Sequence, residues 1–376
     1  MDKKEFKVTP WEVSGKVDYN KVIKEFGVSS IDEKSIKRIE NIAGESHFML
    51  RRGIFFAHRD LKWILDEYEK GNKFFLYTGR APSGKIHLGH LLPWIFTKWL
   101  QDKFDVELWF QFPDEEKFLF KENLDFEKIA EYLEQNMLDV IALGFNPKKT
   151  HFIIDTKHAG LMYKEACKVA KKINFSMVRA SFGMNEQTNI GSIFYTAMQA
   201  VPSFLPSVIA KKEIPCLIPH AIDQDPHFRI TRDIMPRIGH YKPASIQCLF
   251  LPPLTGADGK MSSSEEMAIF TTDNEKEVER KIKKYAFSGG QATIEEHRKK
   301  GGNPEIDICF QYLKMLFEPD DKKLAEIEKK YRNGEMLTGE LKDITIKKIN
   351  AFLKEHQKKR ELAKKRIREF VYKGLI

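Results

Sequence analysis

Two histidines at the end of a glycine-rich turn are the side chains of this sequence best suited to phosphate chemistry. The turn covers Gly79–His90 and closes with His87-Leu88-Gly89-His90. Apolar runs precede and follow it, so we expect a strand to lead through the turn into a helix. Backbone N–H groups and the positive end of a helix dipole meet at such a junction, which favours a bound phosphate. Gly89 has no side chain, so a flat base can pack on the backbone there.

The same turn fits the phosphate loop of many NTPases only in part. Gly79–Lys85 matches G-x-x-x-x-G-K, but that motif continues with Ser or Thr, whose hydroxyl binds Mg²⁺. Here the next residue is Ile86, which carries no ligating atom. The nearest acidic residue after an apolar strand is Asp155, and its strand signal is weak. A zinc site would need a third ligand close to the histidines, and the sequence places none there.

A second element directed at phosphate lies far along the chain. Lys260-Met261-Ser262-Ser263-Ser264 follows a loop rich in Pro and Gly, residues 252–259. A lysine with neighbouring hydroxyl groups on such a loop can close over a triphosphate. Each of the two elements follows an expected strand, and ligands of α/β sheets gather at the carboxyl ends of the strands. Together the two elements indicate nucleotide chemistry.

Alternating strand and helix signals are expected to position both elements. Such alternation implies right-handed crossovers and a mostly parallel sheet, so the predicted fold class is α/β with a Rossmann-like sheet. The expected strands are Lys73–Thr78, Val106–Phe112, His151–Ile154, Cys216–Pro219 and Ile246–Leu251. The expected helices between them are Leu88–Lys103, Asp125–Leu143 and Met162–Lys172.

Two further regions flank this α/β segment. We expect residues 1–72 to form an appended N-terminal helical region, residues 73–273 the catalytic domain, and residues 274–376 an all-helical C-terminal domain. The helical patterns of the first region are Asp18–Phe26, Asp32–Ala43 and Asp60–Glu69. The last region ends in a long helical pattern over Lys342–Phe370.

Positive charge is concentrated near the C-terminal end of the sequence. The 63 Lys and Arg residues exceed the 54 Asp and Glu residues, which gives a net charge of +9. Between Leu341 and Ile376 there are 12 Lys or Arg and 4 Asp or Glu residues. Clustered positive charge suits the phosphate backbone of a nucleic acid and gives salt-dependent binding. A helix face that is merely solvated is the alternative interpretation.

The composition argues against several other classes of protein. Hydrophobic residues make up 42% of the chain, enough for a sizeable core, and no apolar run reaches the length of a membrane span. No apolar signal region follows the N-terminus, so we expect a cytoplasmic protein. The four cysteines are far apart and form no C-x-x-C, so we expect neither a disulfide framework nor a cysteine zinc site: Cys167, Cys216, Cys248 and Cys309.

The two elements resemble the signatures of class I aminoacyl-tRNA synthetases. His87–His90 is similar to the H-I-G-H motif of that class, and Lys260–Ser264 is similar to its K-M-S-K-S motif. Longer segments resemble the tryptophanyl-tRNA synthetases of the archaeal and eukaryotic type, and the resemblance runs from about Pro10 to the C-terminus. The segments are Leu76–Ser83, Phe96–Asp102, Ala221–Pro226, Ala286–Gly290 and Leu337–Lys342.

The resemblance implies a tryptophan–tRNA ligase. Such an enzyme activates L-tryptophan with ATP to tryptophanyl-adenylate and pyrophosphate, and then transfers tryptophan to tRNA(Trp). It implies that ATP is used as a substrate with Mg²⁺, that no metal is permanently bound to the protein, and that the protein is a homodimer. The C-terminal domain would bind the anticodon of the tRNA, although no base-reading residue can be assigned.

The resemblance also implies roles for particular residues. The implied catalytic residues are His87, His90, Lys260, Ser262 and Ser264. ATP binding is implied for Gly79, Arg80, His87, Gly89, His90, Lys117, Lys260 and Met261. For tryptophan, Tyr77 and Gln111 would meet the indole N–H, and the amino group would be held by Glu116, Gln199 and Gln224.

Two positions depart from the family pattern. Ser263 stands where the second signature has lysine, so Lys260 must carry more of the phosphate contact, with help from Lys117. Pro113 stands where this family often has a polar residue, which removes one hydrogen-bond donor beside the substrate.

Two alternatives to tryptophan activation fit the sequence less well. A tyrosyl-tRNA synthetase normally places Asp three residues after a glutamine of its specificity helix, to accept the phenol proton. Here Pro202 stands three residues after Gln199 and cannot accept that proton, whereas indole offers only a donor. A non-catalytic RNA-binding relative would have lost signature residues, and both signatures are present.

Overall fold

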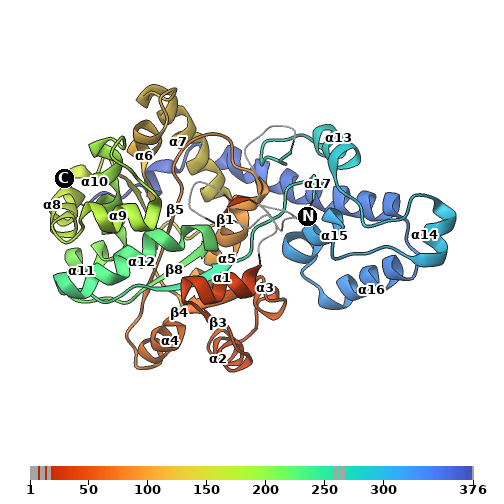
Figure 1. The fold of residues 1–376 in the computed structure, drawn as a ribbon, viewed down its shortest axis with the longest axis horizontal. Helices are drawn as coiled ribbons and strands as arrows, with labels where there is room; N and C mark the ends of the chain where they lie inside the picture. The colour runs from red at the N-terminus through yellow and green to blue at the C-terminus, as the bar shows by residue number, and fades with distance from the viewer. Residues whose placement is uncertain (1–6, 9–12, 15–17, 257–260, 262–266, 375–376) are drawn as a thin grey trace.

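A seven-stranded sheet forms the centre of the computed structural model, which describes residues 7–8, 13–14, 18–256, 261 and 267–374. Its strand order is β3-β4-β9-β8-β5-β6-β7 (Figure 1). The five strands from β9 to β7 are parallel, whereas β3 and β4 add antiparallel pairs at one edge. The mostly parallel sheet predicted from the sequence is therefore confirmed. The strands are β3 Ser29–Ser30, β4 Phe55–Arg59, β5 Phe75–Gly79, β6 Leu108–Phe112, β7 Thr150–Ile154, β8 Cys216–Ala221 and β9 Ala244–Cys248.

Side chains of the parallel strands are buried on both faces of the sheet, as expected where helices cover both sides. Leu76 of β5 and Phe110 of β6 belong to one core with α5 (Leu88–Phe104) and α7 (Phe126–Ala142). Tyr77 and Trp109, which are adjacent to these two residues on the same strands, do not join that core. They belong to a second core with α8 (Ala159–Ala170), α10 (Ile190–Met198) and α12 (Asp225–Ile234).

The other helices are shorter or lie near the two ends of the chain. Before the first parallel strand lie α1 (Tyr19–Phe26), α2 (Glu33–Ala43), α3 (Phe48–Arg51) and α4 (Leu61–Glu69). Within the α/β segment lie α6 (Asp114–Phe120), α9 (Phe175–Phe182) and α11 (Leu205–Ala210). The C-terminal helices are α13 (Glu275–Tyr285), α14 (Ile294–Lys300), α15 (Ile308–Tyr312), α16 (Asp321–Arg332), α17 (Thr338–Ala363) and α18 (Ile367–Phe370). None of the helices in the described ranges combines the length and apolarity needed to cross a bilayer.

Residues 1–72 are tied to the sheet more closely than the sequence predicts. The helical patterns correspond to α1, α2 and α4, but the region also contributes β3 and β4. β4 pairs antiparallel with β9, so this region extends the central sheet. Five residues are too few to show a strand period beside longer helical signals, and the expectation of a purely helical region is therefore incomplete. The proposed domain boundaries at residues 72 and 273 stay predictions.

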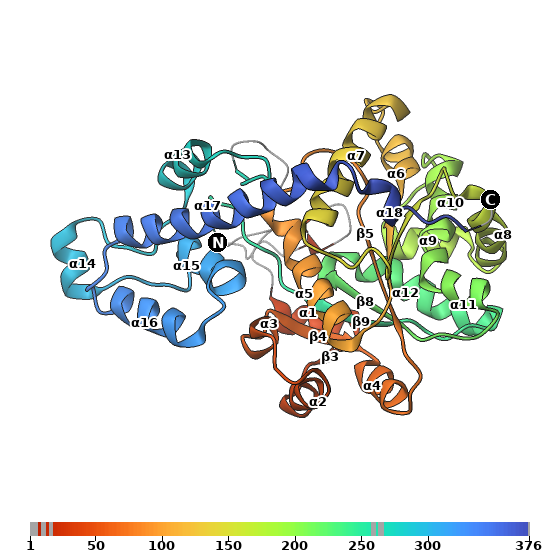
Figure 2. The ribbon, with the colours of Figure 1, turned by 180° about the vertical axis from the view of Figure 1, so that it is seen from behind.

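α17 runs from the C-terminal helices to the α/β segment. It contacts α13, α15 and α16 along one part of its length and α7 along another (Figures 1 and 2). The predicted helix over Lys342–Phe370 is wrong at its end, because α17 stops at Ala363 and α18 begins at Ile367. The break lets Phe370 stack on Phe152 of β7, with 5.3 Å between ring centroids. The Tyr372 N–H then donates to the Phe152 carbonyl at 3.0 Å.

A buried ion pair joins α17 to α7. Asp139 of α7 is 1% exposed and accepts hydrogen bonds of 3.0 Å from both His356 Nε2 and Arg360 Nε of α17. Arg360 also donates to the Gln135 side chain at 2.8 Å. One of the cations counted in the basic C-terminal segment therefore lies in an interior contact and adds nothing to the surface charge.

We expect Asp139→Ala to lower the free energy of unfolding by about 3–5 kcal/mol, because it leaves the Arg360 charge buried without its partner. Glu361→Ala is the matched control: it removes only the exposed ion pair with Lys364, whose contribution should be about 1 kcal/mol or less. Denaturant titration of the three proteins measures both effects. Equal losses in the two variants would contradict a structural role for the buried pair.

Candidate functional site

One cavity of about 710 Å³ lies at the carboxyl ends of β5, β6 and β8. Its wall gathers residues that the sequence analysis selected from five separate segments. These are Tyr77, Gly79, Arg80, His87, Gly89, His90, Gln111, Glu116, Lys117, Gln199, Gln224 and Met261. The other selected residues, Lys260, Ser262 and Ser264, lie outside the described part of the chain, as does Ser263. The cavity thus brings the histidine turn beside the pocket predicted for the amino acid.

The histidine turn forms the start of α5. The His87 N–H donates to His90 Nδ1 at 3.2 Å, so the second imidazole caps the helix, and the two rings stack with centroids 3.6 Å apart. A Cβ atom at Gly89 would lie 3.1 Å from the His87 ring and 3.6 Å from Met261 Cβ. Glycine at this position therefore lets the His87 ring fold back over the helix start beside Met261.

Main-chain bonds join the histidine turn to the segment that follows the second signature. The Leu88 N–H donates to the Ile269 carbonyl at 3.0 Å, and the Thr271 N–H donates to the Ile86 carbonyl at 2.9 Å. Met261 is 4% exposed and its N–H donates to the Leu251 carbonyl at 3.1 Å. The described part of the second signature is therefore held against the first.

The close approach of β5 to β6 brings residues of the two strand ends together in the cavity. A Cβ atom at Gly79 would lie 2.7 Å from the Gln111 carbonyl oxygen, so only glycine fits without displacing β6. The Arg80 N–H donates to that same carbonyl at 2.9 Å. This contact holds the phosphate-directed turn next to Gln111, which points into the predicted amino-acid pocket.

A chain of hydrogen bonds lines the part of the cavity predicted to bind the amino acid. The Tyr77 hydroxyl donates to Gln111 Oε1 at 2.5 Å, and Gln199 Nε2 donates to the Tyr77 oxygen at 2.8 Å. The Tyr195 hydroxyl donates to Gln199 Oε1 and lies 3.4 Å from Glu116 Oε2. Burial raises the pKa values of both tyrosines well above 10.0, so their hydroxyl groups stay protonated.

Cations also line the cavity. Partial burial of Arg80 lowers its pKa to about 10, and its Nε–H has no hydrogen-bond partner among the described residues. Lys117 pairs with Glu116 at 2.6 Å, and Lys121 also lines the cavity. A guanidinium with an unmatched donor and two ammonium groups suit an anionic ligand such as a phosphate chain.

Several residues of the cavity wall are not among the site residues predicted from the sequence. Tyr195 lies one helical turn before Gln199, a spacing that predicts a shared face once Gln199 is assigned. His220 and His227 also line the cavity, and burial lowers their pKa values, that of His227 to about 4, so both are neutral. His220 directly follows the expected strand Cys216–Pro219, which already places it at the carboxyl end of a strand, whereas nothing local in the sequence marks His227. Among the described residues, no three His, Cys, Asp or Glu side chains lie close enough to hold a metal ion.

A pair of buried carboxyl groups lies behind the cavity. Asp155 follows β7 and accepts a bond of 2.6 Å from Gln111 Nε2. Burial is the main reason that the pKa of Glu115 is raised to about 7, and the charges of Asp114 and Glu116 add to it. Burial and the Glu115 charge also raise the pKa of Asp155. From its sequence position, Asp155 is expected only as a weak candidate for the acidic Mg²⁺ partner of an NTPase.

We expect Glu115 to contribute stability that is lost as the pH rises from 4.5 to about 7, because the folded state holds a proton on Glu115 that the unfolded chain releases. Buried histidines with lowered pKa values contribute in the opposite direction over this range. Glu115→Gln should remove the Glu115 contribution, since the amide does not titrate, so the stability of this variant should fall less, or rise more, with pH than that of the parent. The midpoint of thermal unfolding across this pH range measures it. Glu131→Gln, at an exposed glutamate of α7, is the control and should keep the parental slope. A parental slope in Glu115→Gln would contradict the assignment.

Known proteins are similar to this chain in sequence over nearly its full length. The tryptophan–tRNA ligase of Saccharolobus solfataricus is 54% identical over 99% of this chain and 97% of that protein. The corresponding ligase of Pyrococcus furiosus is 51% identical over 99% of this chain and 95% of that protein.

Solved structures give the same result. The tryptophanyl-tRNA synthetase of Plasmodium falciparum superposes with a TM-score of 0.90 at 43% identity, over 95% of this chain and 98% of that one. The predicted Rossmann-like fold is therefore confirmed. Residues 69–354 match the model of the family described as tRNA synthetases class I (W and Y). The chain therefore belongs to the class I tRNA synthetases of that family.

Proposed function

We propose that this chain activates L-tryptophan with ATP and transfers the tryptophanyl group to tRNA(Trp). The observation that supports this most is the convergence of the histidine turn, Met261 of the second signature and the Tyr77–Gln111 pair on one cavity. Full-length relatives that are tryptophan–tRNA ligases support the same activity.

The polar wall of the cavity favours tryptophan over tyrosine. Tyr77 and Gln111 offer oxygen atoms to a substrate, and the indole N–H is a donor with no acceptor. Pro202 stands where a tyrosine pocket would carry a carboxylate, so a phenol proton would meet no acceptor side chain there. A site built to match one polar group discriminates strongly against substrates that lack it.

In the activation step, a carboxylate oxygen of tryptophan bonds to the α-phosphorus of ATP while the bond from that phosphorus to the bridging oxygen of pyrophosphate breaks. The carboxylate is already ionised near neutral pH, so the reaction needs no general base. The protein contributes position and charge stabilisation. Because His90 Nδ1 accepts the His87 N–H, a neutral His90 ring carries its proton on Nε2, which is then a donor for an α-phosphate oxygen.

The departing pyrophosphate is stabilised by cations. Arg80 and Lys117 of the cavity wall contribute to this, and they offset part of the charge that Ser263 removes from the second signature. By the resemblance, Lys260, Ser262 and Ser264 act on the same group, and contacts made only in the transition state raise the rate. Mg²⁺ would be part of the ATP substrate and would offset the negative charge of its phosphates. Glu116, Gln199 and Gln224 bind the amino group of tryptophan.

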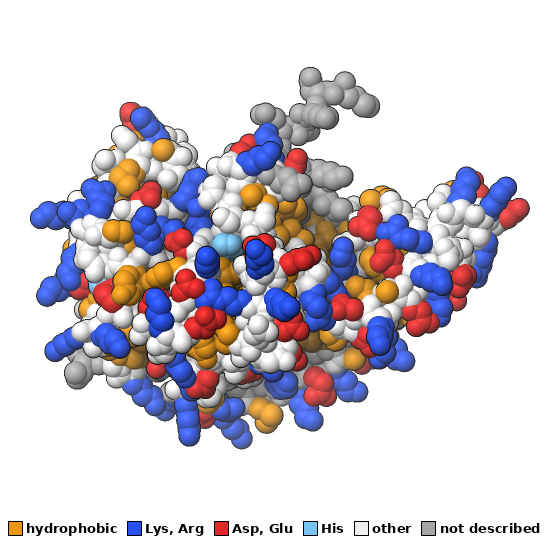
Figure 3. All heavy atoms as spheres, turned by 90° about the horizontal axis from the view of Figure 1, so that it is seen from below, with side chains coloured by type: hydrophobic (Ala, Val, Ile, Leu, Met, Phe, Trp, Pro, Cys, Tyr) orange, Lys and Arg blue, Asp and Glu red, His pale blue; other side chains and the backbone are white. Residues whose placement is uncertain are grey.

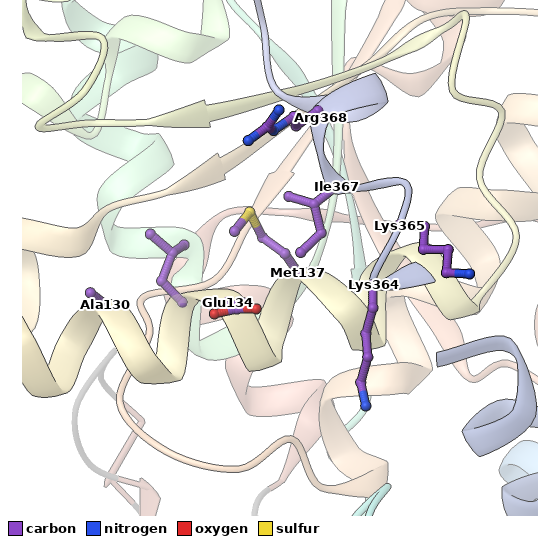
Figure 4. A pocket seen from close by; sticks show the side chains of 8 residues that line it. Ala130, Glu134, Met137, Lys364, Lys365, Ile367 and Arg368 are labelled. Carbon is purple, nitrogen blue, oxygen red and sulfur yellow. The ribbon is translucent and has the colours of Figure 1, made fainter. Parts of the chain in front are cut away.

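The C-terminal helices bind tRNA. Lys358, Lys359 and Lys364 are exposed on α17 and just beyond it, and a groove of about 690 Å³ lies between α7 and the turn into α18. Lys364, Lys365, Ile367 and Arg368 form one side of this groove, opposite Glu134 and Met137 (Figure 4). On the face of the molecule in Figure 3, Lys and Arg side chains are spread among Asp and Glu. Basic residues alone therefore do not identify the tRNA-binding surface, and the basic end of α17 beside this groove is the specific candidate for it.

The resemblance to the family adds two further features to the proposal. The protein is a homodimer, and it is located in the cytoplasm.

Exchange of labelled pyrophosphate into ATP tests the activity. We expect exchange that depends on tryptophan, with little above background when tyrosine or no amino acid is added. Lys260→Ala should slow this exchange by about 10²–10³-fold, the loss expected for one transition-state donor, with tryptophan affinity nearly kept. Lys276→Ala, at an exposed lysine of α13, should leave the rate unchanged. A tyrosine-dependent rate would overturn the substrate, and a Lys260→Ala rate within about threefold of the parent would reject the role of that lysine.

Charge reversal tests the tRNA surface. Changing Lys358, Lys359 and Lys364 to glutamate should weaken tRNA binding and reduce the slope of log K against log salt by about one for each lost phosphate contact. Filter binding at several salt concentrations measures the slope. The control reverses three exposed lysines on α2 and α4, Lys34, Lys37 and Lys62, with the same change in net charge. Equal slopes in the two triple variants would leave the α17 lysines as solvated residues.

A further inference from the structure

We infer that Asp155 is a positioning residue for tryptophan recognition: it sets the direction of the hydrogen bonds along the cavity wall, so that Gln111 and Tyr77 offer acceptors to the indole N–H. This inference rests on the proposed placement of the indole beside those two residues. Asp155 is 1% exposed and does not line the cavity, so it acts through Gln111 and does not touch the substrate.

The orientation of the Gln111 amide depends on its two neighbours. Nε2 lies 2.6 Å from Asp155 Oδ2, and Oε1 lies 2.5 Å from the Tyr77 hydroxyl oxygen. The two ends of an amide have nearly the same shape, so the hydrogen-bond partners decide which end points where. A carboxylate oxygen accepts and cannot donate, so Nε2 must face Asp155. The carbonyl oxygen of Gln111 is then directed toward Tyr77.

The orientation of Gln111 also fixes which groups donate and which accept in the next hydrogen bonds along the cavity wall. Tyr77 has one hydroxyl proton, and its shortest contact with an acceptor is the one to Gln111 Oε1. Its oxygen therefore accepts from Gln199 Nε2 at 2.8 Å. With its nitrogen used in this way, Gln199 turns Oε1 toward the Tyr195 hydroxyl, which donates to it. One carboxylate behind the wall thus determines the donor and acceptor of three successive contacts.

Glu115 keeps Asp155 in the state that this role requires. Asp155 Oδ1 and both carboxyl oxygens of Glu115 are buried and accept no hydrogen bond from the described residues, and the two carboxyl groups interact directly. One proton held between Glu115 and Asp155 Oδ1 removes the repulsion of two buried charges. It also leaves Oδ2 free to act only as an acceptor toward Gln111.

The direction of these bonds matters because indole is a donor only. Tyr77 and Gln111 each retain an oxygen lone pair that the wall does not use, and the indole N–H can share them. In the reversed arrangement the Gln111 nitrogen would face Tyr77 and the substrate, and two N–H groups would oppose each other. Reversal would therefore remove the advantage of tryptophan over an analogue without that N–H.

Asp155→Asn tests this role, because it keeps the shape of the side chain and adds a donor that permits the reversed amide. The measurement is pyrophosphate exchange with tryptophan and with the tryptophan analogue in which sulfur replaces the indole N–H. We expect KM for tryptophan to rise by about 10-fold with kcat nearly unchanged, and the preference for tryptophan over the analogue in kcat/KM to fall by about 10-fold or more.

Two variants separate positioning from structural damage. Glu115→Gln should keep the preference, because its amide donates to Asp155 Oδ1 and leaves Oδ2 an acceptor. Asp307→Asn changes a buried aspartate of the C-terminal helices, which binds the Gly289 N–H and the Tyr331 hydroxyl, and it should affect stability without changing the preference.

The outcomes separate this inference from the proposed activity. No tryptophan-dependent exchange by the parent would overturn the proposed function. An active parent whose preference persists in folded Asp155→Asn, or a parent that does not distinguish the analogue, would overturn the role of Asp155 alone. A loss of preference in Asp155→Asn with retention in Glu115→Gln supports it.

Discussion

The cavity depends on the close pairing of β5 with β6 in the middle of the parallel sheet. Gly79 at the end of β5 approaches the Gln111 carbonyl so closely that a Cβ atom would lie 2.7 Å from it. The pairing places the phosphate-directed turn and the amino-acid pocket on adjacent strand ends. An adenylate-forming enzyme needs its two substrates in contact, and this sheet edge supplies that contact before either substrate binds.

Polar groups in the cavity form two sets, to which the proposed function assigns different tasks. Where the phosphates are proposed to bind, Arg80 is partly buried with an unmatched donor, which leaves positive charge for an anion. Where tryptophan is proposed to bind, hydroxyl and amide groups satisfy one another in a directed chain that begins at Asp155. In this proposal the first set provides charge and the second provides discrimination, because a donor-only substrate group must meet an acceptor.

The C-terminal helix is joined to this cavity through the segments around it. Gln357 of α17 donates to the carbonyl groups of Thr271 and Asp273, each at 2.9 Å. Thr271 in turn bonds to Ile86 at the base of the histidine turn. On its other side, Asp139 anchors α17 to α7, whose Asn136 side chain donates to the Gly84 carbonyl at 2.9 Å. The helix proposed to bind tRNA is therefore linked to the turn that is proposed to bind ATP through Thr271 on one side and α7 on the other.

Much of this molecule follows from local features of its sequence. Gly79–His90 and the apolar runs beside it predicted the strand, turn and helix that carry the histidines, and strand–helix alternation predicted the parallel sheet. β4 was not predicted, because five residues at an edge carry too little pattern, and the end of α17 was placed too far along because the packing of Phe370 on β7 leaves no local signal. The basic segment was recognised, but the burial of Arg360 was not, since its partner Asp139 lies 221 residues away.

The sequence alone determined which side chains are available for chemistry and which strand or helix carries each of them, because those properties depend on near neighbours in the chain. Only the tertiary structure decided how the polar groups are oriented. Gln111 meets Asp155 across 44 residues and Tyr77 meets Gln199 across 122 residues, so the donor and acceptor ends of these groups are defined only after the sheet has formed. The direction of a hydrogen bond belongs to a pair of residues, and no single stretch of this chain contains both members of these pairs.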